Sequence, residues 1–123
     1  MSNAPPPLTT RLLAEGIGSA FLVVAVIGSG IMAETLSPTD VGLQLLENSA
    51  ATAGALIGLI IMFATVSGAH FNPAVTLVER LLGRMNNIEA ASYVGAQLLG
   101  GCVGAMLANL MFAQQTGRGA IFL

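Results

Sequence analysis

At positions 67–77 the chain reads Ser67-Gly68-Ala69-His70-Phe71-Asn72-Pro73-Ala74-Val75-Thr76-Leu77, a polar stretch in a sequence that is otherwise largely apolar. Asn72 is a good N-cap, because its side-chain oxygen can accept a hydrogen bond from an early helix N–H. Pro73 then falls at the first helical position, where its missing N–H costs nothing. The stretch therefore predicts a loop followed by a short helix over residues 73–82. Such a helix measures about 15 Å, half of the roughly 30 Å core of a bilayer.

The residues just before this short helix, 68–71, are predicted to be non-helical backbone at membrane depth. Such backbone is tolerated only where it is buried in protein or lines a water-filled cavity. The free N–H groups and the positive dipole end of a half-helix would disfavour a cation there and favour a lone-pair oxygen. The segment therefore predicts a pore or a binding site, and the alternative is an ordinary capping turn between two helices.

The composition excludes most classes of soluble protein. Of 123 residues, 54% are hydrophobic and 8% are charged, whereas soluble domains carry about 25% charged residues. With a mean hydropathy of +0.82, the chain is predicted to be an integral membrane protein in contact with the lipid bilayer. The net charge of −2 provides no basic field for nucleic acid. The chain has one His, one Cys and no metal-ligand spacing, and no nucleophile–base pair, so we expect neither a metal, a cofactor nor an enzyme.

Three apolar segments are long enough to cross a membrane: residues 12–33, 49–66 and 90–113. With the half-helix they predict an all-α integral membrane fold of three transmembrane helices plus one re-entrant half-helix. The remaining segments are a tail over residues 1–10 that we expect to be disordered, a polar loop over residues 34–48, and an extracytoplasmic tail or truncated loop over residues 114–123.

The charges flanking these segments predict the orientation of the chain. Arg11, Arg80 and Arg84 lie on one side of the predicted crossings, and the loop on the other side contains acids but no Lys or Arg. Because basic residues are enriched on the cytoplasmic side, we expect a cytoplasmic N-terminus and a location in the inner, or plasma, membrane.

Two polar side chains fall inside the predicted crossings. A carboxylate such as Glu15 is costly within a membrane and faces protein or water. It either accepts hydrogen bonds from backbone N–H groups of the re-entrant loop, or lies near enough to the interface to snorkel there beside Arg11. The amide of Gln97 either hydrogen-bonds the loop or bridges two helices.

Small residues recur every four positions in two of the crossings: Ala50, Gly54 and Gly58 in the second, and Ala96, Gly100, Gly104 and Ala108 in the third. Such stripes let helix backbones approach closely in lipid. We assign both stripes to helix packing, within the chain or between subunits, rather than to a ligand.

Three strings in the chain resemble the aquaporin, or major intrinsic protein, family. Residues 67–76 resemble its first Asn-Pro-Ala box with the leading Ser-Gly-Ala-His and the trailing Val-Thr. Residues 14–19 resemble its Ala-Glu-x-x-Gly-Thr signature, with Ser19 in place of Thr, and residues 95–97 resemble its Ala-Gln motif. The resemblance extends over about residues 11–113 and favours the loop-supporting role for Glu15.

Members of this family are built from two inverted repeats, and this chain corresponds to the N-terminal repeat only, because it contains no second Asn-Pro-Ala. The resemblance therefore implies a missing second repeat, or an oppositely oriented copy, as a partner, and a homo-oligomer that is a tetramer. The position at which the family's water channels place an aromatic ring falls on Thr52. A small hydroxyl there favours a wider and more polar constriction.

The resemblance implies a passive channel half-module for water or small neutral solutes, such as glycerol or metalloid hydroxides. It also implies that ions are excluded by the half-helix dipole and by the Asn-Pro-Ala box of Asn72, Pro73 and Ala74. The backbone carbonyls of Gly68, Ala69, His70 and Phe71 are the expected acceptors, and the Asn72 amide is the expected donor. By resemblance only, Val75 and Leu22 form the apolar wall. His70 is either a structural residue of the loop or a titrating gate. The alternative function is a non-conducting truncated membrane fragment or a helix-packing interaction protein.

Overall fold

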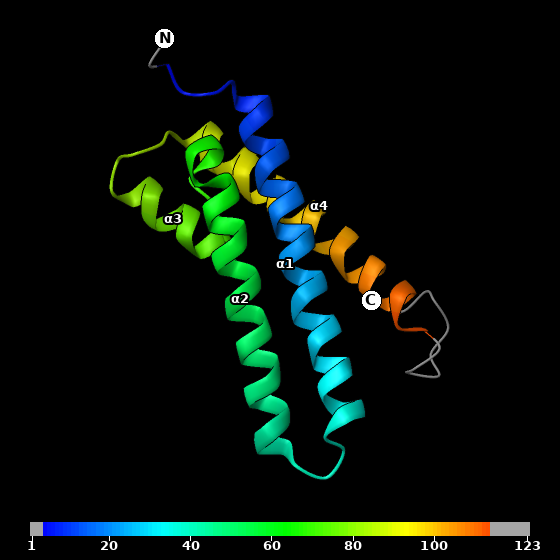
Figure 1. Cartoon of the computed structure of the whole chain (residues 1–123). Helices are drawn as coiled ribbons and strands as arrows, with labels where there is room; N and C mark the ends of the chain where they lie inside the picture. The colour runs from blue at the N-terminus through cyan, green and yellow to red at the C-terminus, as the bar shows by residue number, and fades with distance from the viewer. Residues whose placement is uncertain (1–3, 114–123) are drawn as a thin grey trace.

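The computed structural model describes residues 4–113, and its regular structure over that range is entirely helical. The helices are α1 (Leu8–Leu36), α2 (Val41–Ser67), α3 (Pro73–Leu81) and α4 (Asn87–Met111), as Figure 1 shows. Helices α1, α2 and α4 are each long and apolar enough to cross a membrane. The predicted all-α fold is confirmed, and the chain is an integral membrane protein.

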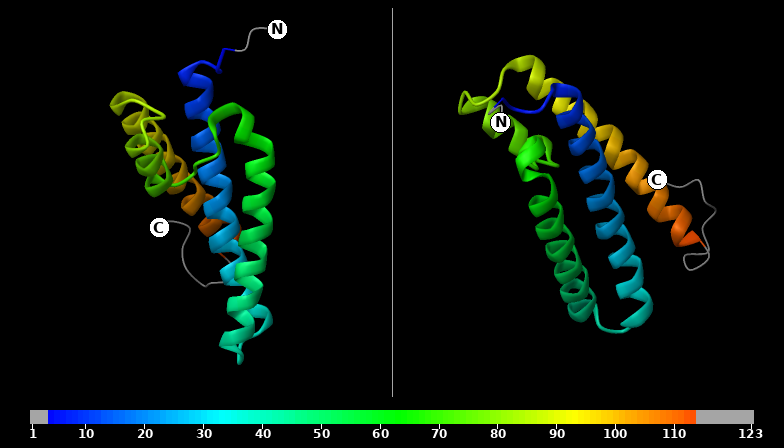
Figure 2. Two further views of the ribbon diagram at one scale, coloured as in Figure 1. Left: turned by 90° about the vertical axis from the view of Figure 1, so that its left-hand side faces the viewer. Right: turned by 45° about the horizontal axis from the view of Figure 1, so that its top comes forward.

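Helix α1 lies at the centre of the arrangement, with α2 packed against one side and α4 against another. Figures 1 and 2 show that α1 and α2 run antiparallel, and that α4 crosses α1 at a marked angle. The nine-residue α3 packs against α4. The start of α1 and the connection between α3 and α4 lie at one end of the molecule, so that Arg11, Arg80 and Arg84 share that end.

Glycine allows α4 to cross α1 at close range. A Cβ added at Gly100 would overlap the carbonyl oxygen of Gly16, and a Cβ added at Gly104 would overlap the carbonyl oxygen of Ala20. Gly100, Gly104 and Ala108 are all buried. The packing predicted for the small-residue stripe of the third crossing is therefore confirmed within the chain.

The small-residue stripe of the second crossing does not pack within the described part of the chain. A Cβ added at Gly54 or Gly58 would meet nothing within 4 Å, and Ala50 is exposed. Gly54 and Gly58 line an open apolar groove of about 450 Å³ between α1 and α2. For this stripe, packing between subunits remains a prediction.

The helices are longer than predicted at the end of the molecule opposite Arg11. The polar loop expected over residues 34–48 is reduced to residues 37–40, because α1 continues to Leu36 and α2 begins at Val41. Asp40 caps α2 by accepting a 2.9 Å hydrogen bond from the backbone N–H of Leu43. The Asn48 side chain donates to the carbonyl oxygen of Val26 at 3.0 Å. Of the polar residues that indicated a longer loop, Asp40 caps α2 from the short loop, and Asn48 is a helical residue whose side chain ties α2 to α1.

The start of α3 is as predicted, and the remaining helix boundaries differ from the prediction by one to four residues. Helix α1 begins at Leu8, so the last three residues of the predicted disordered tail are helical. Helix α4 begins at Asn87 rather than at residue 90, because Asn86 and Glu89 form a capping box. The predicted C-terminal tail or loop, residues 114–123, lies outside the described residues.

Candidate pore site

Helix α3 begins where the sequence predicts it, with Asn72 as the N-cap and Pro73 at the first helical position. The Asn72 side-chain oxygen accepts a 2.8 Å hydrogen bond from the backbone N–H of Ala74. The side-chain nitrogen of Asn72 donates no hydrogen bond within residues 4–113, and the residue is exposed. The N-terminal end of α3, with its positive partial charge, is therefore accompanied by a free amide donor.

The loop between α2 and α3 reverses direction through residues with left-handed backbone. Gly68 has φ +92°, Ala69 has φ +52° and Phe71 has φ +50°. Left-handed backbone at a residue other than glycine costs of the order of 1–3 kcal/mol and persists only when its surroundings enforce it. The loop therefore needs strong external hydrogen bonds to keep this shape.

Glu15 supplies the largest share of those hydrogen bonds. Its carboxylate is fully buried and accepts from the backbone N–H of His70 at 3.0 Å and of Phe71 at 2.8 Å. The Ser67 hydroxyl donates to the same carboxylate at 2.6 Å and the Gln97 amide donates at 2.9 Å. Each carboxylate oxygen thus accepts two hydrogen bonds, and the side chain does not extend to the membrane surface.

These bonds determine where the loop carbonyls point. In a trans peptide the N–H of one residue and the C=O of the preceding residue point in opposite directions. Because the N–H groups of His70 and Phe71 point toward Glu15, the carbonyls of Ala69 and His70 point away from it. The Ala69 N–H donates to the Ser67 hydroxyl oxygen at 3.1 Å. By the same rule, the Gly68 carbonyl points away from that hydroxyl. Within residues 4–113, none of these three carbonyls accepts a hydrogen bond.

The aromatic ring of Phe71 anchors the other end of the loop. Phe71 is 6% exposed, and its ring occupies the space that a Cβ at Gly18 would fill. The ring also meets the ring of Phe63 edge-on, with centroids 5.9 Å apart. The side chain of Phe71 therefore packs into the helix pair α1 and α2, while its backbone N–H binds Glu15.

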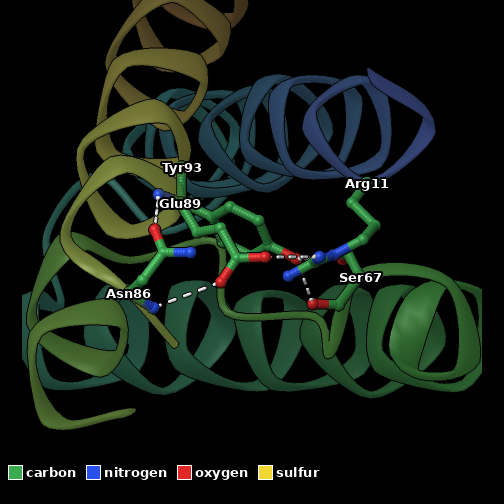
Figure 3. A network of polar contacts seen from close by, with 5 residues as sticks. All are labelled: Arg11, Ser67, Asn86, Glu89 and Tyr93. Carbon is green, nitrogen blue, oxygen red and sulfur yellow. Dashed lines mark hydrogen bonds and ion pairs between the residues drawn. The ribbon is translucent and has the colours of Figure 1, made fainter. Parts of the chain in front are cut away.

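A second network holds the loop where it leaves α2. The Tyr93 hydroxyl donates to the carbonyl oxygen of Ser67 at 2.7 Å and accepts from Arg11 Nε at 2.9 Å. Arg11 also forms a 3.1 Å ion pair with Glu89, which caps α4 together with Asn86, as Figure 3 shows. The network joins the start of α1, the end of α2 and the start of α4.

Tyr93 and Thr76 are residues of the site that the sequence analysis does not assign. Both are fully buried. Tyr93 lies four positions before Gln97 on α4, and so one helical turn from a buried amide. This spacing is the sequence signal by which Tyr93 could have been found. Thr76 lies four positions after Asn72, and its hydroxyl accepts a 2.9 Å hydrogen bond from Gln97.

The structure brings some of the predicted site residues together and leaves three of them outside the cluster. Glu15, Gln97 and the loop over residues 68–72 form one cluster. Val75 is exposed on α3, and Leu22 is half-buried on α1, two turns beyond Glu15. Thr52 lies on α2, fifteen residues before Ser67 and so about 22 Å along the helix. Its hydroxyl oxygen is buried and has no hydrogen-bond partner among the described residues.

Comparison with known proteins assigns the chain to a family. The family model described as "Major intrinsic protein" matches residues 4–122. The chain belongs to the major intrinsic protein family. The resemblance of the chain to this family is thereby confirmed.

Three curated relatives illustrate the similarity. Aquaglyceroporin AqpS of Rhizobium meliloti is 49% identical over 105 residues, which cover 85% of this chain and 45% of the relative. The probable aquaporin NIP4-2 of Arabidopsis thaliana is 34% identical over 107 residues, 85% of this chain and 36% of the relative. Aquaporin Z of Rhodopseudomonas palustris is 34% identical over 109 residues, 89% of this chain and 45% of the relative. This member of the family thus spans less than half the length of each of these relatives.

Proposed function

We propose that this chain forms one half of a passive channel for water or small neutral solutes. The observation that carries the proposal is the re-entrant loop, whose N–H groups bind the buried carboxylate of Glu15 and whose carbonyls of Gly68, Ala69 and His70 accept nothing within residues 4–113. The names of the relatives, aquaporin and aquaglyceroporin, support the same class of activity.

The arrangement suits a neutral, hydroxyl-bearing solute. The row of carbonyls over residues 68–71 accepts hydrogen bonds from the hydroxyls of the solute, and the Asn72 amide donates to its oxygen. The positive end of α3 raises the energy of a cation, and a single row of carbonyls coordinates it incompletely. Val75 and Leu22 supply the apolar side of the path. His70 contributes its carbonyl to the row.

The solute that we favour is a small neutral polyol or hydroxide, such as glycerol or a metalloid hydroxide, in addition to water. Thr52 lies at the predicted constriction, and its side chain is small and carries a hydroxyl. The relative at 49% identity is named an aquaglyceroporin, which supports the same solute class.

The channel requires a second half. The apolar side chains of α3 that are exposed in this chain are Val75, Leu77, Val78 and Leu81. A second repeat, or an oppositely oriented copy of this chain, would cover them and supply the opposite half-helix. We place the N-terminus in the cytoplasm, because Arg11, Arg80 and Arg84 share one end of the molecule, and we propose a tetramer as the assembly.

The size of the native product decides between the two sources of the second half. An antibody against residues 1–10 should detect, in the native membrane, a band near twice the 12.5 kDa of this chain if a second repeat is fused to it. A band near 12.5 kDa should instead come with glycerol and water flux in liposomes that contain this chain alone.

Replacing Asn72 with Asp tests the role of the box in whichever product conducts. The carboxylate keeps the cap but removes the amide donor and places a negative charge at the end of α3. We expect reduced glycerol flux or a measurable cation leak in stopped-flow and ion-flux assays. Unchanged solute flux together with unchanged ion exclusion would refute the role given to Asn72.

The second candidate function is a non-conducting membrane protein that associates with partner helices. The exposed face around Gly54 and Gly58 on α2 favours it, because small residues at this spacing support close helix contacts. This candidate predicts no solute flux from a preparation that is folded and oligomeric by circular dichroism and crosslinking.

A further inference from the structure

Hydrogen bonds link Glu15 to His70 through Gln97 and Thr76, and the donor and the acceptor of each bond can be assigned. Gln97 Nε2 lies 2.9 Å from Glu15 Oε2 and 2.9 Å from Thr76 Oγ1. A carboxylate that receives four donors acts only as an acceptor, so the amide group that faces it is the NH₂ and not the oxygen. The NH₂ has two hydrogens, and one goes to each of these two oxygens.

The Gln97 assignment also decides which atom donates in the contact between Thr76 and His70. The Thr76 hydroxyl oxygen accepts from Gln97, and its single hydrogen needs an acceptor because the residue is fully buried. Within residues 4–113 the remaining hydrogen-bond contact of this hydroxyl is His70 Nδ1, at 3.0 Å. The Thr76 hydroxyl therefore donates to Nδ1, and a neutral His70 carries its proton on Nε2.

The Nε2 atom of His70 lies at the wall of a small polar cavity. A Cβ built at Gly68 would be 3.1 Å from Nε2, and both residues line this cavity of about 220 Å³. Within residues 4–113, Nε2 has no hydrogen-bond partner. The ring of Tyr93 lies close to that of His70, with centroids 5.1 Å apart. The Tyr93 hydroxyl, however, already accepts a hydrogen bond from Arg11 and donates one to Ser67, as Figure 3 shows.

We propose that Thr76 is a positioning residue that holds His70 as the Nε2–H tautomer, so that the cavity offers a hydrogen-bond donor to an oxygen atom of a small neutral hydroxylated solute. This inference rests on the proposed channel function and deepens it. A hydroxyl group donates one hydrogen bond and accepts others, and the donor of His70 lies in the loop that also presents the free carbonyls of Gly68 and Ala69. Such a pairing of a donor with acceptors serves both functions of a hydroxyl group in a polyol or a hydroxide, whereas a cation can use only the acceptors.

Nuclear magnetic resonance tests the tautomer directly, because His70 is the only histidine in the sequence. In the full 123-residue chain with ring-¹⁵N histidine, we expect a protonated Nε2 and an unprotonated Nδ1, in a ratio of roughly tenfold or more, because the other tautomer would leave the Thr76 hydroxyl without an acceptor. A protonated Nδ1, or an even mixture of the two tautomers, would overturn the proposal. The wild-type spectrum alone decides this point.

Substitutions at position 76 test the positioning role. In Thr76→Val the Nδ1 resonance should move to the position of a nitrogen that accepts no hydrogen bond, whereas Thr76→Ser should leave it near the wild-type position. Thr65→Val, at an exposed threonine of α2, is the matched control and should change nothing. If the Nδ1 resonance of Thr76→Val coincides with that of the control, Thr76 does not position the ring. If Thr76→Val fails to fold, a displaced Nδ1 resonance in Thr76→Ser overturns the role.

The donor itself is tested with glycerol as the probe. Adding glycerol to the same sample should displace the Nε2 resonance in a saturable manner and leave Nδ1 unchanged, and an unmoved Nε2 resonance would overturn the donor role. Glycerol flux is measured in liposomes on the complete channel, that is, on this chain together with its second half. If the spectrum is as expected but glycerol flux is absent, the result counts against the proposed channel function only. If flux is present but His70 has the opposite tautomer, the result counts against this inference only.

Discussion

Replacing Glu15 with Gln is the most direct test of what holds the re-entrant loop. The amide has nearly the same size and shape as the carboxylate, but it offers one acceptor oxygen where the carboxylate offers two. In the native chain, Oε1 accepts from Ser67 and His70, and Oε2 accepts from Phe71 and Gln97. Whichever way the new amide turns, its NH₂ faces two donors.

The magnitude follows from those two donors. A buried donor that loses its acceptor costs about 1–3 kcal/mol, so two of them cost about 2–6 kcal/mol. The two hydrogen bonds that remain also become weaker, because neutral hydrogen bonds are roughly half as strong as those to a charged group. Because the backbone at Ala69 and Phe71 is already strained, we expect the loop to open locally rather than to adapt to the new side chain.

Hydrogen exchange at single-residue resolution measures this opening. The amides of His70 and Phe71 should exchange at least about thirtyfold faster in Glu15→Gln than in the native chain, which corresponds to 2 kcal/mol. Glu34→Gln is the matched control, because Glu34 lies on the same helix and is exposed. If both loop amides stay as protected in Glu15→Gln as in the control, Glu15 does not hold the loop, and the reasoning about the direction of the carbonyls is wrong.

Two further substitutions test the packing around the site. Gly100→Val should destabilise the chain by about 1–3 kcal/mol or more in detergent unfolding followed by circular dichroism, because the new Cβ overlaps the Gly16 carbonyl. Gly54→Val, where a Cβ meets nothing within 4 Å, should stay near the native stability, and equal effects of the two substitutions would argue against the α1–α4 crossing. Tyr93→Phe keeps the ring but leaves the Ser67 carbonyl and Arg11 Nε without their partner. It should lower the free energy of unfolding by about 1–3 kcal/mol, and a native unfolding curve would show that this hydroxyl contributes nothing.

The sequence predicted those features of the site that depend on a few neighbouring residues. The cap at Asn72 followed from the preference of Asn for this position and of Pro for the next one. The loop-directed interpretation of Glu15 followed from the cost of a carboxylate in a membrane, once the family resemblance was added, and the two hydrogen bonds that it requires are present in the structure. Whether this cluster lines a conducting path remains a prediction.

The features that the sequence did not predict depend on contacts between distant segments. The polar residue Asn48 indicated a loop by composition, yet it is helical and its side chain donates to the carbonyl oxygen of Val26 on α1, which only the packed helices make possible. Tyr93 gave no local signal of its partners, because Arg11 lies 82 positions away in the sequence. The stripe of Gly54 and Gly58 has the same spacing as that of Gly100 and Gly104, so spacing alone did not show which of the two packs within the chain.

The left-handed backbone of the loop shows why local propensity fails at this site. Ala and Phe disfavour positive φ, so the sequence alone predicts ordinary backbone at positions 69 and 71. At Phe71 the backbone N–H binds Glu15, while the ring occupies the space left by Gly18. A glycine at position 71 would relieve the backbone but lose the ring, and with it the apolar contact that holds the loop between α1 and α2. The side chain at position 71 is thus needed for packing, and the strain that it causes is offset by a carboxylate 56 positions away.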